Sequence, residues 1–219
     1  MSIERVVLND IETARIRSAA VTDRALLKLR ERQSSHQAAC DRLDECWPAL
    51  LRAAELVTGS LKRGRKVLTV GNGGSAAEAQ HFAAELVGRF RLERSAYPVM
   101  ALTTDSSILT AIGNDYGFSN VFSRQVAAFA QPGDLLIAFS TSGESENAIN
   151  AALEARRRGA SVLAITGERA CRIEQYADVV VHAPTSDTPA VQELHTMFTH
   201  MLCDIAESEL AGLDERSPA

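Results

Sequence analysis

A histidine and a glutamate four residues apart are the first side chains in this sequence that could carry out chemistry. His81 and Glu85 fall in an expected helix, and residues at i and i+4 share one helix face about 6 Å apart. Such a pair can bind a metal ion or act as an acid and a base. A surface His/Glu pair is also a common weak helix contact, so the spacing alone leaves both interpretations open.

A second group of polar residues lies near the C-terminus, where Gln192, His195 and His200 share one expected helix. Gln192 and His200 are separated by roughly 12 Å of helix rise, and long side chains could still share an ion. His195 is the nearer competitor, because it follows Gln192 by three residues. Spacing does not choose between the two histidines, and side chains that only face solvent remain the alternative for each.

Two loops have the composition of ligand-binding loops. The first, residues 71–75, reads GNGGS and follows a short apolar run. Glycines let the backbone approach a ligand, and the next helix offers free N–H groups to an anion or a hydroxyl. The loop is neither a dinucleotide-binding motif nor a P-loop, because the required acidic residue and Gly-Lys-Ser/Thr are missing. A glycine-rich turn that serves packing alone is the alternative.

The second loop, residues 140–145, reads STSGES and carries four hydroxyl groups, on Ser140, Thr141, Ser142 and Ser145. Hydroxyls together with helix N–H groups can surround a phosphate without any lysine. Ser and Thr are also ordinary N-caps, so one of these residues needs no further function. Glu144 is unfavourable beside a dianion and is expected to point to solvent.

These loops must be held by the elements around them. Short, fully apolar runs alternate with helical patterns, which is typical of a parallel sheet covered on both faces. The sequence therefore predicts an α/β fold with a doubly wound, flavodoxin-like parallel sheet of about five strands and a helical N-terminal extension. The expected strands are 67–70, 99–102, 135–139, 161–165 and 177–181, and the expected final helix covers about 190–210.

The chain divides into three expected parts. Residues 1–66 carry apolar positions at helical spacing, and Pro48 marks a helix start or a kink. This helical extension must pack on the sheet or on another subunit, since a lone amphipathic helix is unstable. Residues 67–212 form the α/β domain, and residues 213–219 form a frayed tail.

Composition narrows the class of protein. The net charge of −5 argues against a general nucleic-acid or membrane binder, which usually has a basic face. The four cysteines contain no C-x-x-C pair, so neither a zinc ribbon nor a redox dithiol is indicated. The first ten residues form no apolar h-region and no apolar run reaches about 18 residues, so we expect a cytoplasmic enzyme without nucleic-acid or membrane partners.

Five motifs in one order resemble a known family. They are GNGGS at 71–75, QHFAAEL at 80–86, GNDYG at 113–117, STSG at 140–143 and QELH at 192–195. Together they are similar to the phosphoheptose isomerases of the SIS (sugar isomerase) domain family, over about residues 50–210. The resemblance implies conversion of D-sedoheptulose 7-phosphate to D-glycero-D-manno-heptose 7-phosphate through an enediol, the first step of activated heptose biosynthesis.

The resemblance also implies roles for particular residues. One Zn²⁺ per subunit would be held by His81, Glu85, Gln192 and His200, with Glu85 and His200 as the acid–base residues. The sugar would contact Asn72, Gly73, Gly74, Glu85, Asn114, Asp115 and Gln192, and the phosphate would contact Ser140, Thr141, Ser142 and Ser145. The family forms homotetramers with active sites between subunits, which gives the N-terminal helices a partner.

The chain departs from the family pattern at three places. Glu144 stands where an Asn is usual, Pro189 where some members carry an Asp, and Ala190-Val191 where Arg-Ile is frequent. The competing class is a binding module, since one relative associates with the replication initiator DnaA and has no known isomerase chemistry. That relative lacks the glutamate at the place of Glu85 and the histidine at the place of His200. This chain has both, which favours the isomerase.

Overall fold

A computed structural model describes residues 3–214 of the protein, with side chains described for 21–211. The helices are α1 (Ile3–Cys40), α2 (Trp47–Lys62), α3 (Gly74–Val87), α4 (Ser106–Tyr116), α5 (Ser123–Phe129), α6 (Glu146–Arg157) and α7 (Thr188–Asp214). The strands are β1 (Val67–Val70), β2 (Val99–Ala101), β3 (Leu135–Ser140), β4 (Ser161–Thr166) and β5 (Val179–His182), and short 3-10 helices are η1 (Leu43–Cys46), η2 (Phe118–Asn120) and η3 (Arg172–Tyr176).

The five strands form one parallel sheet in the order β2-β1-β3-β4-β5. In its register, Val67 of β1 pairs with Val99 on one side and with Leu135 on the other. This order is that of flavodoxin-like folds, which confirms the predicted fold class. Because the order reverses beside β1, the loops after β1 and β3 lie at the position where such sheets bind ligands.

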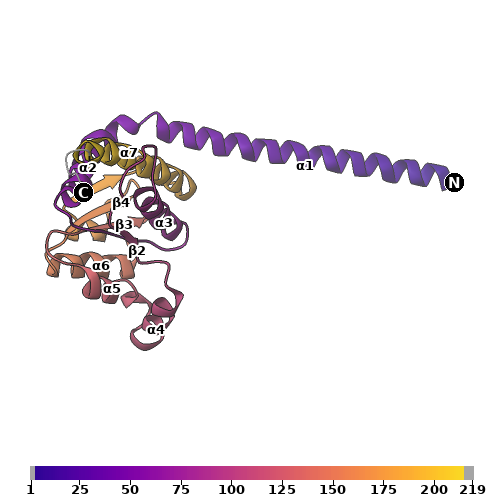
Figure 1. Cartoon of the computed structure of the whole chain (residues 1–219). Coiled ribbons are helices and arrows are strands. Elements are labelled where there is room, and N and C mark those ends of the chain that lie inside the picture. Colours follow the sequence, from indigo (N-terminus) through magenta and orange to yellow (C-terminus); the bar gives the residue numbers. More distant parts are fainter. Residues whose placement is uncertain (1–2, 215–219) are drawn as a thin grey trace.

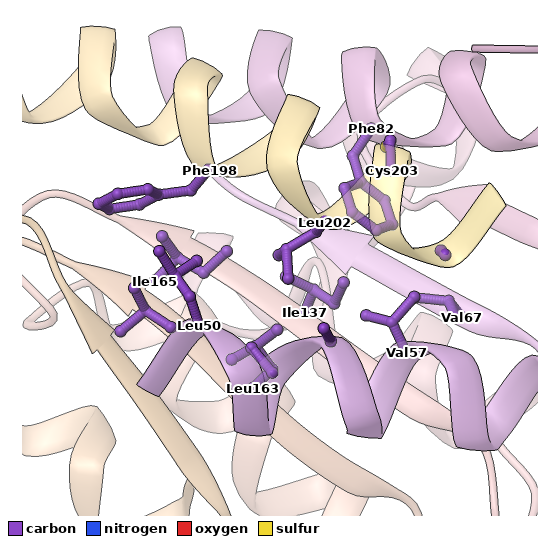
Figure 2. Close-up of a cluster of buried hydrophobic side chains, with 14 of the residues drawn as sticks. Leu50, Val57, Val67, Phe82, Ile137, Leu163, Ile165, Phe198, Leu202 and Cys203 are labelled. Atoms are coloured by element: carbon purple, nitrogen blue, oxygen red, sulfur yellow. The ribbon is translucent and has the colours of Figure 1, made fainter. Parts of the chain in front are cut away.

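Each face of the sheet carries its own apolar core. One core joins α2, α3 and α7 to the sheet, with Val57, Phe82 and Phe198 among its buried side chains (Figure 2). The other core lies under α4, α5 and α6 and includes Val126 and Ile149. The alternate residues of β3 point to opposite cores, which is why this strand is apolar throughout.

The helical N-terminal region is two helices that differ in what they contact. α2 begins at Trp47 with Pro48 in its first turn, where proline is tolerated, and it packs on the sheet and on α7. α1 extends far beyond the rest of the molecule (Figure 1) and exposes Leu27 and Leu29. Across the part of the chain that the structure describes, none of the helices combines the length and apolarity needed to cross a membrane.

The structure adds α5 and the three 3-10 helices to the elements expected from the sequence, and it shifts several boundaries. α5 was not predicted, because it has only seven residues and no side-chain cap, and its Val126 is held by packing in the second core. β5 begins two residues later than expected, and α7 continues to Asp214. The predicted tail therefore starts inside α7, and its other residues lie outside those described.

Candidate active site

Two parallel helices on the same face of the sheet, α3 and α7, form a seam of paired side chains. Along this seam Gly74 faces Gln192, Glu78 faces Thr196, and His81 faces His200. At the far end, Glu207 of α7 binds the loop that follows α3. The pairs advance by similar steps because both helices rise about 1.5 Å per residue in the same direction.

The third pair of the seam carries the titratable cluster. Nε2 of His81 lies 3.1 Å from Oε1 of Glu85 and 3.3 Å from Nε2 of His200. The two imidazole rings meet edge to face with centroids 4.9 Å apart. His81 and Glu85 are half-buried, and His200 is exposed. The structure thus brings together residues from the two regions that the sequence marked separately.

The donor set of this cluster suits a zinc ion. One ligand atom from each of His81, Glu85 and His200 lies within 4.8 Å of the other two. Ligands at about 2.1 Å from a tetrahedral zinc are separated from each other by roughly 3.4 Å, close to the two distances given above. Two imidazole Nε2 atoms that face each other cannot both donate a hydrogen bond, and a shared cation would satisfy both lone pairs.

A buried carboxylate behind His81 was missed in the sequence. Glu78 is 8% exposed, and its Oε2 accepts a hydrogen bond of 2.8 Å from the Thr196 hydroxyl. Its Oε1 has no hydrogen-bond partner among the described residues and lies 3.5 Å from Nδ1 of His81. A carboxylate on Nδ1 fixes the imidazole so that Nε2 faces a metal. The signal available in the sequence was the i, i+3 spacing of Glu78 and His81.

Gln192 lies at the start of the seam, at some distance along α7 from His200. A Cβ on Gly74 would collide with the carboxamide of Gln192, so the glycine is required for this close approach. Together with Glu78 and Thr196, these residues line a cavity of about 380 Å³. Gly73 is in the left-handed region with φ of 56°, which explains the second glycine of the loop.

His195 is placed differently from His200. It is 1% exposed beneath α7, and its Nε2–H donates to the Thr166 carbonyl oxygen over 3.1 Å. Burial lowers the pKa of His195 from 6.5 to about 4, which keeps the ring neutral. Of the two histidines left open by spacing, only His200 therefore lies beside His81 and Glu85.

The hydroxyl-rich loop lies between β3 and the N-terminus of α6. Ser145 is the N-cap residue of α6, but its side chain makes no capping bond. The Ser142 hydroxyl oxygen accepts from the Glu144 N–H, and the buried Ser140 hydroxyl oxygen accepts from the Gly143 N–H. Thr141 and Ser142 line a second cavity of about 280 Å³ that also includes Thr188, the first residue of α7.

A pair of amides ties the two loops together. Asn72 and Asn147 exchange two hydrogen bonds of 2.8 and 2.9 Å, one in each direction. Asn147 is buried in the first turn of α6, so the glycine loop and the hydroxyl-rich loop are held side by side. The alternative of a glycine-rich turn for packing alone does not account for this link.

Two expected substrate residues are not brought to the cluster. Asn114 and Asp115 are exposed on α4, and the Asn114 amide donates to the Asp115 carboxylate. α4 packs on the other face of the sheet from α3 and α7 and lies away from them (Figure 1). Within one chain, these residues and the histidine cluster therefore occupy separate regions.

The residues at and near the three places that depart from the family pattern make contacts within the chain. Glu144 is exposed as expected, its carboxylate accepts a 2.8 Å hydrogen bond from the Arg172 N–H, and the residue lines the same cavity as Thr141 and Ser142. Asp187, two residues before Pro189, binds Ser35 and Arg32 of α1. Ala190 and Val191 are buried in the first turn of α7.

Known proteins are similar to this chain in both sequence and fold. The SIS domain family model matches residues 33–167. A phosphoheptose isomerase of Rhodospirillum rubrum is 49% identical over 171 residues, which is 78% of this chain and 91% of the relative. Solved phosphoheptose isomerases of Francisella tularensis and Neisseria gonorrhoeae superpose with TM-scores of 0.81 and 0.75, at 37% and 41% identity. The matches cover 84% and 86% of this chain and 98% and 99% of theirs.

Proposed function

The chain belongs to the phosphoheptose isomerase family of SIS domain proteins, and we propose that it converts D-sedoheptulose 7-phosphate to D-glycero-D-manno-heptose 7-phosphate. The observation that carries the proposal is the cluster of His81, Glu85 and His200. An aldose–ketose isomerase needs a base near C1 and C2, an acid for the oxygen and a cation or donor for the enediolate. In this proposal Glu85 would be the base, His200 would be the acid, and the cluster would hold the cation.

The proton transfers follow from the two reactive side chains. Glu85 removes a proton from C1 of the open-chain ketose while the C2 oxygen gains one, which gives the 1,2-enediol. The C1 hydroxyl then loses its proton and C2 gains one, which gives the aldose. His200 exchanges the oxygen-bound protons, since an imidazole can face a cation with one nitrogen and hold a proton on the other.

The metal proposal rests on the donors of the cluster. His81, Glu85 and His200 would hold one zinc ion, with Gln192 as a fourth ligand, although an amide oxygen is an uncommon zinc ligand. When bound, the ion would polarise the substrate carbonyl and stabilise the enediolate. Glu78 would orient the His81 ring from behind.

The phosphate end of the substrate would bind at the N-terminus of α6. Ser142, Ser145 and Thr141 present hydroxyls there beside the helix N–H groups, and Ser140 supports the loop from inside. Asn72, which its bonds to Asn147 hold beside this loop, would contact the sugar hydroxyls together with Gly73 and Gly74.

The assembly proposed is a homotetramer with active sites between subunits. Its support is the extended α1 with exposed Leu26, Leu27 and Leu29, and an apolar groove lined by Trp47, Leu51 and Ile205. The separation of Asn114 and Asp115 from the histidine cluster within one chain also fits a site that a second subunit completes. Light scattering at micromolar concentration should give the mass of four chains, and a stable monomer would contradict this assembly.

The test of the function is direct. Purified protein is incubated with sedoheptulose 7-phosphate, and NMR should show an aldose phosphate growing as the ketose is consumed. The second candidate, a regulatory binding protein, is disfavoured by the presence of both Glu85 and His200 in one cluster. Protein that is folded and loaded with zinc but forms no aldose would refute the isomerase and favour that candidate.

A further inference from the structure

The seam contains a second group of charged side chains beyond the histidine cluster. Arg94 and Glu207 form an ion pair of 3.1 Å in which each side chain is 1% exposed. Arg94 comes from the loop after α3, and Glu207 follows His200 by seven residues, two turns along α7. No residue of this pair belongs to the site described above.

The carboxylate of Glu207 organises the loop after α3. It accepts hydrogen bonds of 3.1, 2.7 and 2.7 Å from the backbone N–H groups of Phe90, Arg91 and Leu92. Burial on its own raises the pKa of Glu207, but these donors and Arg94 outweigh it, and the net pKa lies below the usual value. The loop is therefore bound to α7 through one ionised carboxylate.

Arg94 holds the end of α3. Its guanidinium donates to the carbonyl oxygens of Glu85, Leu86 and Gly88 over 3.0, 2.9 and 3.1 Å. These are carbonyls that the last turn of a helix leaves without partners. One of them belongs to Glu85 itself, so the residue that carries the proposed base is fixed at its backbone by Arg94.

The same loop reaches the other reactive residue. The ring of Phe90 lies against the imidazole of His200, with centroids 5.6 Å apart and planes inclined by 30°. Since the Phe90 N–H is bound to Glu207, the position of this ring depends on the ion pair. Arg94 therefore binds the backbone of Glu85, and Glu207 binds the backbone of Phe90, whose ring packs on His200.

We propose that Arg94 and Glu207 are positioning residues that set the separation of Glu85 and His200 across the seam. A buried ion pair is weak evidence for stability, because desolvation of the two charges offsets their attraction. The pair matters here for geometry, because it fixes the end of α3, the position of the following loop along α7, and the Phe90 ring against His200. This inference rests on the proposed isomerase function and adds two residues to it.

The test compares three variants with the wild type. Glu207→Gln and Arg94→Lys keep size or charge but lose part of the hydrogen bonding, and Phe90→Leu removes the ring from His200 without touching the ion pair. Misplacement of a catalytic group by about 1 Å can cost up to 10²-fold in rate. We expect kcat per folded molecule to fall roughly 10- to 100-fold in the first two variants and less in Phe90→Leu. KM for the sugar phosphate should stay near the wild-type value, because the hydroxyl-rich loop is untouched.

A second buried carboxylate provides a matched control. Asp134 is 1% exposed, pairs with Lys66 over 2.6 Å and accepts from the N–H groups of Lys66 and Gln131. It lies before β3, at the end of the sheet away from the loops of the site. Asp134→Asn should therefore lower the melting temperature in a manner comparable to Glu207→Gln but leave kcat per folded molecule and zinc affinity unchanged.

Zinc affinity separates failure of this inference from failure of the proposed function. Titration of zinc into chelator-treated protein should show affinity reduced roughly 10-fold or more in Glu207→Gln, as for other outer-shell contacts. If the wild type does not isomerise the sugar, the proposed function fails and the zinc titration alone decides the inference. Unchanged kcat and zinc affinity in both ion-pair variants, or an equal loss in Asp134→Asn, would overturn it.

Discussion

Two groups of titratable residues lie along the α3–α7 seam and differ in how many of their hydrogen-bonding groups are occupied. One is the histidine cluster at the third pair, and the other is the Arg94–Glu207 ion pair at the far end, which forms the fourth pair. At the fourth, Arg94 and Glu207 are almost fully buried and hydrogen-bond to backbone groups and to each other, and the Arg94 guanidinium also lies over the Tyr97 ring. At the third, His81, Glu85 and His200 are partly open to solvent, and among the described residues their side chains hydrogen-bond only to one another, with Glu78 3.5 Å from His81. The hydrogen-bonding groups of Arg94 and Glu207 are therefore occupied, whereas the histidine cluster retains groups that a ligand could bind.

This difference separates structural from chemical charges. A side chain whose donors and acceptors are all occupied cannot rearrange toward a ligand without a large cost. Two imidazole nitrogens 3.3 Å apart with a carboxylate oxygen beside them, by contrast, are an arrangement that a shared cation would satisfy. Reactivity is therefore expected at the third pair, and geometric support at the fourth.

The largest effect should come from removing the base. Glu85→Gln keeps the shape of the side chain but removes the proton acceptor, and loss of a general base costs on the order of 10²–10⁴ in rate. We expect kcat for sedoheptulose 7-phosphate to fall by that factor, measured by NMR with zinc content determined in parallel. Nearly full turnover in Glu85→Gln would refute the mechanism while leaving the fold and the phosphate loop in place.

The two histidines of α7 give this prediction a matched control. His200→Asn should reduce kcat by a comparable factor, because His200 lies in the cluster. His195→Asn should be milder in kcat per folded molecule, because His195 is buried against Thr166. Equal losses of kcat in the two variants would remove the distinction between them.

The next effect concerns the phosphate end of the site. Hydrogen bonds to a charged group contribute about 1.5–3 kcal/mol each, so Ser142→Ala/Ser145→Ala should weaken phosphosugar binding by roughly 10²-fold or more. Isothermal titration with the sugar phosphate measures this loss. Ser208→Ala is a control, since that hydroxyl only donates to the Asp204 carbonyl oxygen of its own helix. Unchanged affinity in the double variant would exclude the loop from the site.

How far the sequence predicted this site depended on the range of each interaction. The His81–Glu85 pair and the two loops were visible because their residues are close in the chain. The alternation of apolar runs likewise predicted the sheet and its flavodoxin-like order. The choice of His200 over His195 could not follow from spacing, because it depends on which side of α7 faces the sheet.

Other features of the structure could not be predicted from the order of residues along the chain. The contacts of Glu207 with residues 90–92 join positions more than a hundred residues apart, and nothing in their types marks them as a pair. The exchange between Asn72 and Asn147 is hidden for the same reason. The short α5 was missed because packing, rather than local propensity or capping, stabilises it.

A smaller effect is expected at Glu78, one step behind the proposed metal ligand His81. Glu78→Gln keeps the acceptor for Thr196 but removes the charge beside Nδ1 of His81, and loss of such a contact typically costs 10- to 100-fold in metal affinity. Zinc titration of chelator-treated protein should show a loss of roughly this size. Thr196→Val removes the hydroxyl that binds the other oxygen of Glu78, and it should lower zinc affinity less than Glu78→Gln does. Wild-type zinc affinity in Glu78→Gln would show that Glu78 does not orient His81.

The smallest effect concerns stability and the buried histidine of α7. The folded-state pKa of His195 is about 4, below its unfolded value of 6.5, so between these values the unfolded chain binds the extra proton. The contribution is fully favourable above about pH 6.5 and is lost as pH falls toward 4. Between pH 7 and 5.5 this amounts to about 1 kcal/mol, or roughly 2–4 °C in melting temperature for a chain of this size.

The measurement isolates His195 by comparison with His195→Gln, whose amide can still donate to the Thr166 carbonyl oxygen. Both proteins are treated with a chelator, so that release of metal from the proposed site at His81 and His200 would not contribute at acid pH. The fall in melting temperature between pH 7 and 5.5 should be about 2–4 °C larger for the wild type than for the variant. An equal fall in the two proteins would mean that His195 is charged or solvated in the folded state.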